Sequence, residues 1–453
     1  MHAGRTIGVE EELHLVDAET SRLAPRAPQV LGALPDEGFS AELQRSTVET
    51  NSDVCHTLDD LRRTVLDRRR QVIGAAEKLG LGVFASGTAP LEDATDFELT
   101  IGGRFSRMQR DYRLLLDEHL VCGVQVHIGV ADRDLAVRIL PRVEEALPVL
   151  LALSTSSPFW RGGDSGYASM RTMLWQRWPT AGRAPFVGSH RDYVDLVDAL
   201  IANGTISDPN MTYFDVRPSP HLPTVELRVC DACPVLDDVI LIAALFRAVV
   251  EQAAEQEYAG SEPVRFAGPL YRAAMWRACR SGLSGELLDG LAEAVPAPVA
   301  VNRLVERLRP QLEATGDWEV VVSLVAGTLA RGSSSERQRA RFAAHGDLAD
   351  VVALLVAETA GEGSAGTGVA TPWTSGYRSN ATDEALGPSG VPAPAYEAIF
   401  AALEQLEPLE LTRRARHLAT EAARQDLTFG VGGEQRPVPV DGFPRVISAH
   451  EWQ

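Results

Sequence analysis

The feature that most constrains the fold is a set of ionisable side chains at strand positions that would otherwise be apolar. In residues 6–17 the two-residue alternation of a β-strand puts Glu10, Glu12 and His14 on one face, and Val9 and Leu13 on the other. The Cβ atoms of Glu10 and Glu12 would then be roughly 6–7 Å apart. Two carboxylates at that spacing repel each other unless a positive group lies between them. The chain must therefore fold so that this face receives positive charge.

Glu49, His127 and Glu226 lie in other strand-like segments, each among β-branched and aliphatic neighbours. If these strands join one half-buried sheet, a single face is lined by four glutamates and one histidine. An oxygen-rich set of this kind suits a hard cation, Mg²⁺ or Mn²⁺. The predicted metal ligands are Glu10, Glu12, Glu49, His127 and Glu226.

A zinc site is less favoured, because this set contains one histidine and no thiolate. Cys230 and Cys233 form a lone C-x-x-C pair without a second pair at zinc-finger spacing, so we predict a structural role for them.

The chain has five cysteines, an odd number that fits a reducing compartment better than a disulfide framework. We therefore expect a cytoplasmic protein.

Charge excludes several mechanisms. Only one of the 43 basic residues, Lys78, is a lysine, and it lies at the polar end of a predicted helix. A P-loop needs a lysine beside its glycines, and Schiff-base chemistry needs a reactive amine, so Lys78 suits neither. The net charge of −19 argues against nucleic acid and against an anionic membrane surface as partners.

Arginine supplies the complementary charge. Residues 157–182 interleave aromatic residues and arginines with glycines, which in an acidic protein favours a small anionic ligand over nucleic acid. Arg161, Arg171 and Arg228 are the predicted substrate-binding residues. Arg228 has the strongest case, because it follows Glu226 by two residues on the same strand face. A guanidinium beside a metal-binding carboxylate can hold a carboxylate or phosphate bidentately, and such a site suits a nucleoside triphosphate.

Strands and helices interleave without the regular rhythm of a parallel sheet, so the sequence predicts an α+β fold with an antiparallel sheet. Further strands are expected at residues 81–86 and, as a pair, at 212–218 and 223–230. The predicted helices cover residues 57–79, 133–153 (interrupted near Pro141 and Pro148), 191–203 and 237–258. We expect a catalytic domain at residues 1–360, a linker rich in Gly, Pro, Ser and Thr at 361–394, and a C-terminal segment at 395–453.

The ordered motifs resemble those of the YbdK-type carboxylate–amine ligases, which belong to the glutamate–cysteine ligase type 2 family. The motifs that carry the resemblance are residues 8–12, 42–49, 125–130, 157–182, 224–231, 276–283 and 336–339. One departure is Gln125, which stands where the family's H-V-H-V-G version has a histidine.

This resemblance implies a glutamine-synthetase-like catalytic fold, a curved antiparallel sheet with helices packed on its outer side. It also implies ATP-dependent amide-bond formation from glutamate and cysteine through an acyl phosphate, with ATP as co-substrate and Mg²⁺ or Mn²⁺ as cofactor. The five predicted ligands match metal-ligand positions of the family, and Arg228 and Glu226 are the predicted catalytic residues. Motif membership assigns nucleotide binding to Arg277, Arg280, Arg337 and Arg339.

Residues 396–453 resemble the opening of a circularly permuted ATP-grasp protein, which we interpret as a truncated or stand-alone remnant of a fusion. Two alternative functions remain: a metal-dependent amidohydrolase, and a non-catalytic partner module of an ATP-grasp protein. The arginine-rich second half argues against the first, and the intact carboxylate set argues against the second. The expected partners are amino-acid substrates and ATP, a second copy in a homodimer and an ATP-grasp protein, with no nucleic acid and no membrane.

Overall fold

The structure, a computed structural model, describes residues 4–92, 97–264, 267–290, 293–361, 428–431 and 434–437. The chain divides into two compact units, Met1–Gly363 and Ser364–Gln453. The predicted linker, apart from Gly361, and most of the predicted C-terminal segment lie outside the described residues. In the second unit a two-stranded hairpin pairs β12 (Thr428–Val431) with β13 (Glu434–Pro437).

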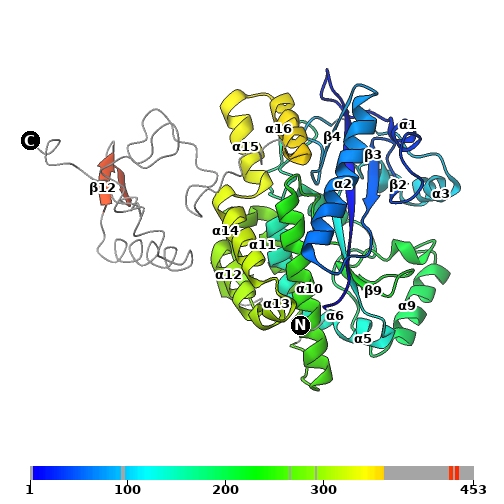
Figure 1. Cartoon of the computed structure of the whole chain (residues 1–453), viewed down its shortest axis with the longest axis vertical. Coiled ribbons are helices and arrows are strands. Elements are labelled where there is room, and N and C mark those ends of the chain that lie inside the picture. Colours follow the sequence, from blue (N-terminus) through cyan, green and yellow to red (C-terminus); the bar gives the residue numbers. More distant parts are fainter. Residues whose placement is uncertain are drawn as a thin grey trace, which may run out of the picture. The chain divides into compact units, whose positions relative to one another are not determined.

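One seven-stranded antiparallel sheet organises the first unit (Figure 1). Its strands are β1 (Ile7–Asp17), β2 (Phe39–Ala41), β3 (Thr47–Asn51), β4 (Leu81–Phe84), β5 (Val124–Gly129), β8 (Val216–Pro218) and β9 (Thr224–Leu227). Their order is β2-β3-β1-β5-β9-β8, and β4 pairs with the C-terminal half of β1. Two separate hairpins join β6 (Phe159–Trp160) to β7 (Gly163–Asp164), and β10 (Glu286–Asp289) to β11 (Glu293–Pro296).

Sixteen α-helices are present among the described residues. They are α1 (Ala27–Leu31), α2 (Leu58–Glu77), α3 (Gly103–Tyr112), α4 (Leu114–Asp117), α5 (Arg133–Arg138), α6 (Leu140–Val143), α7 (Leu147–Ser154), α8 (Met170–Trp175), α9 (His190–Ala202), α10 (Leu236–Tyr258), α11 (Gly268–Ser281), α12 (Ala297–Arg307), α13 (Arg309–Thr315), α14 (Trp318–Arg331), α15 (Ser334–His345) and α16 (Leu348–Ala360).

Local sequence signals explain where several helices begin. Thr57 caps α2, since its hydroxyl accepts a hydrogen bond from the backbone N–H of Asp60. The helix predicted at 133–153 is interrupted near Pro141 and Pro148 as expected and forms three helices, because these prolines lie in the first turns of α6 and α7. Proline is tolerated in a first turn but cannot continue a helix from the preceding one.

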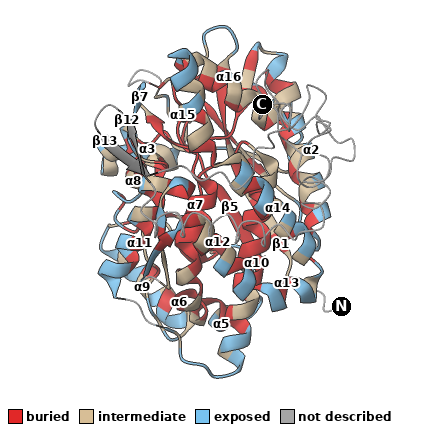
Figure 2. Cartoon of the chain, turned by 90° about the vertical axis from the view of Figure 1, so that its left-hand side faces the viewer, coloured by how far each residue is buried: buried red, intermediate tan, exposed pale blue. Residues whose placement is uncertain are grey.

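Helices cover one face of the sheet. Both α2 and α10 contact β1, and α10 also contacts β5. The residues of α10 from Asp238 to Val250 are all buried, because α7, α13 and α14 pack against its other sides (Figures 1 and 2). A helix that is apolar all round belongs in such a central position. The predicted α+β fold, an antiparallel sheet with helices packed on one side, is confirmed.

No helix among the described residues is both long enough and apolar enough to cross a membrane.

A buried ion pair fastens the helix layer to the middle of the sheet. Glu11 of β1 points to the side opposite Glu10 and Glu12, where Arg69 of α2 donates to both of its carboxylate oxygens at 3.0 and 2.6 Å. The same guanidinium donates to the carbonyls of Cys233 and Pro234, both at 2.6 Å. Arg69 therefore joins the central strand, α2 and the segment that leads into α10.

We predict that Arg69→Leu lowers the free energy of unfolding by about 3–5 kcal/mol, because it leaves the Glu11 carboxylate buried without a counter-charge. Urea denaturation followed by circular dichroism measures this change. The matched control is Arg70→Leu, since the neighbouring Arg70 side chain is 68% exposed and should change stability by less than about 0.5 kcal/mol. Equal losses for the two variants would contradict the prediction.

Candidate active site

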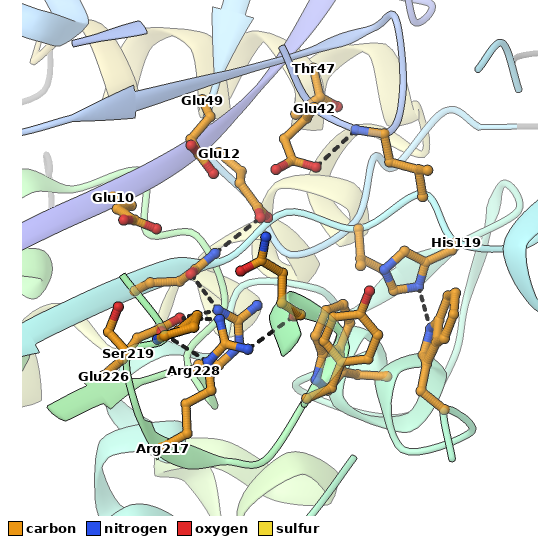
Figure 3. A pocket seen from close by; sticks show the side chains of 18 of the residues that line it. Glu10, Glu12, Glu42, Thr47, Glu49, His119, Arg217, Ser219, Glu226 and Arg228 are labelled. Carbon is orange, nitrogen blue, oxygen red and sulfur yellow. Dashed lines mark hydrogen bonds and ion pairs between the residues drawn. The ribbon is translucent and has the colours of Figure 1, made fainter. Parts of the chain in front are cut away.

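The sheet register brings the predicted ligands together. Glu12 of β1 lies opposite Glu49 of β3, and His127 of β5 lies opposite Glu226 of β9. Arg217 of β8 is the next cross-strand partner of Glu226. Directly opposed residues project to the same face of a sheet, so these side chains meet on the face away from α2 and α10. The five predicted ligands, Glu10, Glu12, Glu49, His127 and Glu226, all line one cavity of about 340 Å³ (Figure 3).

Three carboxylates converge at one end of this cavity. One oxygen from each of Glu12, Glu42 and Glu49 lies within 4.8 Å of the others, and Figure 3 shows them pointing toward one another. Short hydrogen bonds hold their positions: the Ser40 hydroxyl donates to Glu49 at 2.7 Å, and the backbone N–H of Leu43 donates to Glu42 at 2.8 Å. The sequence analysis did not assign Glu42, which follows β2 in a loop where no strand alternation marks it.

The electrostatics of this trio favour a bound cation. Burial raises the pKa of Glu12 to about 7, with a further contribution from Glu49. Burial also raises the pKa of Glu42 well above its ordinary value, and raises that of Glu49, in each case reinforced by a neighbouring carboxylate. Ionisation of all three carboxylates is therefore costly, and the positive charge of Arg171 offsets this cost only in part for Glu12. The all-oxygen donor set and its close spacing fit a hard divalent cation such as Mg²⁺ or Mn²⁺.

Glu10 and His127 face each other beside this trio. His127 Nε2 lies 3.2 Å from a Glu10 oxygen, while Nδ1 is hydrogen-bonded to the Thr224 hydroxyl at 2.9 Å. Burial opposes protonation of the ring, but the Glu10 and Glu226 carboxylates outweigh it, so the pKa of His127 is raised. Nε2 is buried and has no hydrogen bond among the described residues. Its predicted role as a metal ligand stays a prediction.

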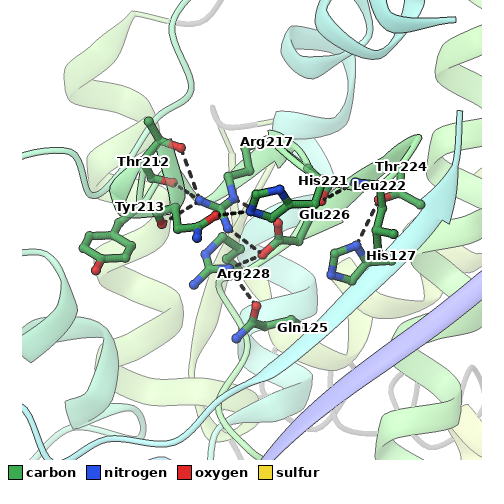
Figure 4. Close-up of polar contacts among 12 residues, drawn as sticks. Gln125, His127, Thr212, Tyr213, Arg217, His221, Leu222, Thr224, Glu226 and Arg228 are labelled. Atoms are coloured by element: carbon green, nitrogen blue, oxygen red, sulfur yellow. Dashed lines mark hydrogen bonds and ion pairs between the residues drawn. The ribbon is translucent and has the colours of Figure 1, made fainter. Parts of the chain in front are cut away.

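Two arginines hold Glu226 (Figure 4). Arg217 donates to both of its oxygens, at 2.9 and 3.2 Å, and Arg228 pairs with one of them. Although burial acts in the opposite direction, these guanidinium groups hold the pKa of Glu226 far below its usual range. Arg217 is itself fixed by the carbonyl of Thr212 at 2.8 Å. The sequence analysis missed Arg217, because its pairing with Glu226 depends on the register of β8 and β9.

Gln125 links the arginine pair to the carboxylate trio. Its amide oxygen accepts from Arg228 at 2.6 Å, and its amide nitrogen donates to Glu12 at 3.2 Å. A glutamine side chain offers both an acceptor and two donors, so it can satisfy a guanidinium and a carboxylate at once. This is the residue at which the sequence departs from the family's histidine.

Two of the predicted substrate-binding arginines lie away from the cavity lining. Arg171 is buried, with its guanidinium donating to the carbonyls of Arg228 and Val229, both at 3.3 Å. It therefore supports the chain at the end of β9 and does not face the cavity. Arg161 pairs with Glu118 at 2.7 Å and lies over the Trp160 ring. Only Arg228 of the three lines the cavity.

The predicted nucleotide-binding arginines also lie outside this lining. Arg277 pairs with Glu286 at 3.2 Å, and Arg337 with Glu358 at 2.7 Å. Arg339 pairs with Asp164 of the β6–β7 hairpin at 2.7 Å, and Arg280 lies over the ring of the nearby Tyr167. Each guanidinium already has a protein partner, and nucleotide contact by these four residues stays a prediction.

Known structures share this architecture. The chain aligns with a glutamate–cysteine ligase from Francisella tularensis crystallised with AMP, at a TM-score of 0.58 and 12% identity, over 79% of this chain and 89% of that one. It also aligns with a bifunctional glutathione synthetase from Pasteurella multocida, at a TM-score of 0.57 and 13% identity, over 80% of this chain and 53% of that one. The fold is therefore that of the glutamate–cysteine ligases.

Sequence comparison identifies the family within the glutamate–cysteine ligase fold. Residues 6–354 match the family described as "Glutamate-cysteine ligase family 2(GCS2)". A Mycolicibacterium smegmatis protein named "Putative glutamate--cysteine ligase 2-2" is 51% identical over 79% of this chain and 90% of its own length. A Frankia alni protein named "Putative glutamate--cysteine ligase 2-3" is 46% identical over 98% of this chain and 54% of its own. The chain belongs to glutamate–cysteine ligase family 2, and it spans about half the length of the Frankia relative.

We predict that Glu49→Gln weakens the binding of Mn²⁺ at least tenfold, because it removes one charged oxygen ligand from the trio. Isothermal titration calorimetry with the metal alone measures this. The control is Glu77→Gln, an exposed carboxylate at the end of α2, which should bind Mn²⁺ as the unchanged protein does. The same affinity in Glu49→Gln as in the control would show that the trio holds no cation.

Proposed function

We propose that this protein is an ATP-dependent carboxylate–amine ligase that joins the side-chain carboxylate of glutamate, or of a similar acid, to an amine. The observation that carries the proposal is the division of one cavity into opposite charges. Glu12, Glu42 and Glu49 form an acidic end, and Arg217 and Arg228 form a basic wall on β8 and beyond β9. Family membership supports the same reaction class.

The acidic end suits the metal-bound phosphates of ATP. Phosphoryl transfer needs positioning and charge neutralisation more than covalent chemistry from the protein. A divalent cation held by Glu12, Glu42 and Glu49 would neutralise phosphate oxygens there and polarise the phosphorus that is attacked. Lys78, the sole lysine, is exposed beyond the end of α2. Within the described residues, the permanently charged cationic groups that line the cavity are Arg104, Arg217 and Arg228.

The basic wall suits the acid substrate. Arg228 is held in place by Glu226 and Gln125, and its Nε atom is buried without a hydrogen bond among the described residues. A guanidinium with a donor left over can bind a substrate carboxylate. Arg217 and Glu226 act on this substrate through Arg228, because they fix its orientation.

The proposed reaction has two steps. An oxygen of the substrate carboxylate attacks the γ-phosphorus of ATP, which breaks the bond to the β-phosphate oxygen and releases ADP. The amine nitrogen then attacks the acyl carbon of the acyl phosphate, the bond from that carbon to the phosphate oxygen breaks, and inorganic phosphate leaves as the nitrogen loses a proton. Such a site must also keep water away from the acyl phosphate.

We predict that Arg228→Lys lowers kcat/KM for the acid substrate at least 100-fold, since an ammonium group lacks the planar fork that holds a carboxylate bidentately. A coupled assay of ADP release, run with Mg²⁺-ATP and a panel of acids and amines, measures this. Glu226→Gln should abolish ADP release. Glu313→Gln, which alters a 54% exposed carboxylate on α13, is the control and should retain full activity.

Two results would contradict the proposed function. One is ADP release that does not depend on an acid and an amine together. The other is cleavage of γ-glutamyl amides in buffer without nucleotide, which would support the amidohydrolase instead.

A further inference from the structure

Four aromatic rings form a continuous wall on one side of the cavity. Its members, which we call the aromatic wall, are His119, Trp175, Trp178 and Tyr213, and all four line the cavity. The ring centroids of His119 and Trp175 are 4.9 Å apart, as are those of Trp175 and Tyr213. Trp178 completes the wall at 5.1 Å from His119 and 5.3 Å from Tyr213. Trp175 and Trp178 belong to the segment 157–182, whose aromatic residues and arginines favour a small anionic ligand, but none of the four was predicted individually as a site residue.

The aromatic wall lies next to Arg228, the residue proposed to bind the acid substrate. The Arg228 guanidinium lies 5.8 Å from the centre of the Trp175 ring, so the wall begins where the acid substrate would be held. Phe105 and Met108 of α3 line the same cavity. The rings are tilted or edge-on to one another, with interplanar angles of 33° to 79°. A molecule bound beside the acid substrate would thus meet both faces and edges of aromatic rings.

Several polar groups of the aromatic wall are neutral. The indole N–H of Trp178 donates to His119 Nδ1 at 3.1 Å, which fixes the neutral tautomer with its proton on Nε2. Burial lowers the pKa of His119 to about 3, with smaller contributions from two arginines. The side-chain oxygen of Gln44, which also lines the cavity, is buried and has no hydrogen-bond partner among the described residues. The charged Arg104 of α3 also lines the cavity, and it pairs with Asp208 at 3.1 Å.

These features suit an uncharged, planar group. An aromatic side chain gains ring–ring contacts and buries a large apolar area, whereas a small thiol has too few atoms to cover four rings. An acidic side chain would find no uncommitted cation among the residues of the aromatic wall. Gln44 and His119 can accept from and donate to polar atoms on the rim of a planar group.

We propose that the aromatic wall binds the side chain of the amine co-substrate and selects amines with a flat apolar side chain over small ones such as cysteine. This inference rests on the proposed ligase function. It assigns His119, Trp175, Trp178 and Tyr213 to substrate specificity, and leaves phosphoryl transfer to the carboxylates and arginines described above.

The test compares amines that are matched in everything except the side chain. ADP release is measured with Mg²⁺-ATP and glutamate, using L-phenylalanine against L-cysteine, and phenethylamine against methylamine. We expect kcat/KM to be at least tenfold higher for the aromatic member of at least one pair. Higher values for cysteine and methylamine, in a protein that does release ADP with them, would overturn the inference and leave the ligase function standing.

Variants of the aromatic wall test whether its rings cause the preference for aromatic amines. Trp175→Leu should lower the aromatic-to-small ratio of kcat/KM at least fivefold, and Trp178→Phe should lower it too because His119 loses its fixed tautomer. The control is Trp276→Leu, since Trp276 is 47% exposed on α11 and outside the cavity lining, and the ratio should change less than twofold. An unchanged ratio in both wall variants would also overturn the inference.

A different outcome is expected if the proposed ligase function itself is wrong. If no amine stimulates ADP release, phenethylamine binding is measured directly by calorimetry. Binding that Trp175→Leu weakens at least fivefold and Trp276→Leu does not would support the aromatic wall as an amine site, and no detectable binding would overturn it.

Discussion

The two-residue alternation of β1 is the constraint on which the rest of the site depends. Because β1 lies inside the sheet, Glu10 and Glu12 face the cavity while Glu11 faces the helices. A slip of one residue in the register would exchange the two sets, and would bury two carboxylates against α10. The ion pair between Glu11 and Arg69 opposes that slip, since only the observed register brings Glu11 to its buried partner. The same pair that stabilises the fold thereby orients the site.

The electrostatic cost of ionising the buried carboxylates differs between the two ends of the cavity. Glu226 is neutralised by two guanidinium groups, and its pKa is correspondingly depressed. Glu12 receives the backbone N–H of Gly123 at 2.6 Å, but its pKa stays raised, as do those of Glu42 and Glu49. The protein therefore neutralises the carboxylate at one end of the cavity, whereas at the other end the positive charges of Arg171 and Arg228 offset the effect of burial on Glu12 only in part. A cation bound to the trio would relieve a repulsion that the fold leaves in place, which ties cation affinity to the stability of this arrangement.

Sequence patterns predict the parts of the structure that obey local periodicity. The alternation around Glu10, Glu49, His127 and Glu226 is sufficient to predict one shared face, and the buried helix at 237–258 is found within one residue as Leu236–Tyr258. Residues whose position depends on tertiary contacts were not predicted. They are Glu42 in a loop, Arg217 across a hairpin, and the aromatic wall, whose residues come from separate segments of the chain. His14 shares the periodicity of Glu12, yet it is fully buried, with its ring 5.0 Å from that of Phe84 and its Nε2 atom 3.2 Å from the Ser86 carbonyl. Substrate binding by Arg171 stays a prediction. Interleaving with aromatic residues does not by itself distinguish a ligand-binding guanidinium from one that donates to backbone carbonyls, as that of Arg171 does.

The near absence of lysine is compatible with how this protein buries positive charge. Arg69, Arg217 and Arg247 are each at most 5% exposed, and each pairs with a carboxylate while also donating to a backbone carbonyl. A buried ammonium tends to lose its proton and offers no planar fork, whereas a guanidinium stays charged and directs five N–H groups to several acceptors. Replacing any of these arginines by lysine would leave carbonyls or carboxylate oxygens unsatisfied. In this fold, arginine therefore has two roles. Arg69 holds a helix on the sheet, and Arg217 keeps the Glu226 carboxylate ionised in the cavity.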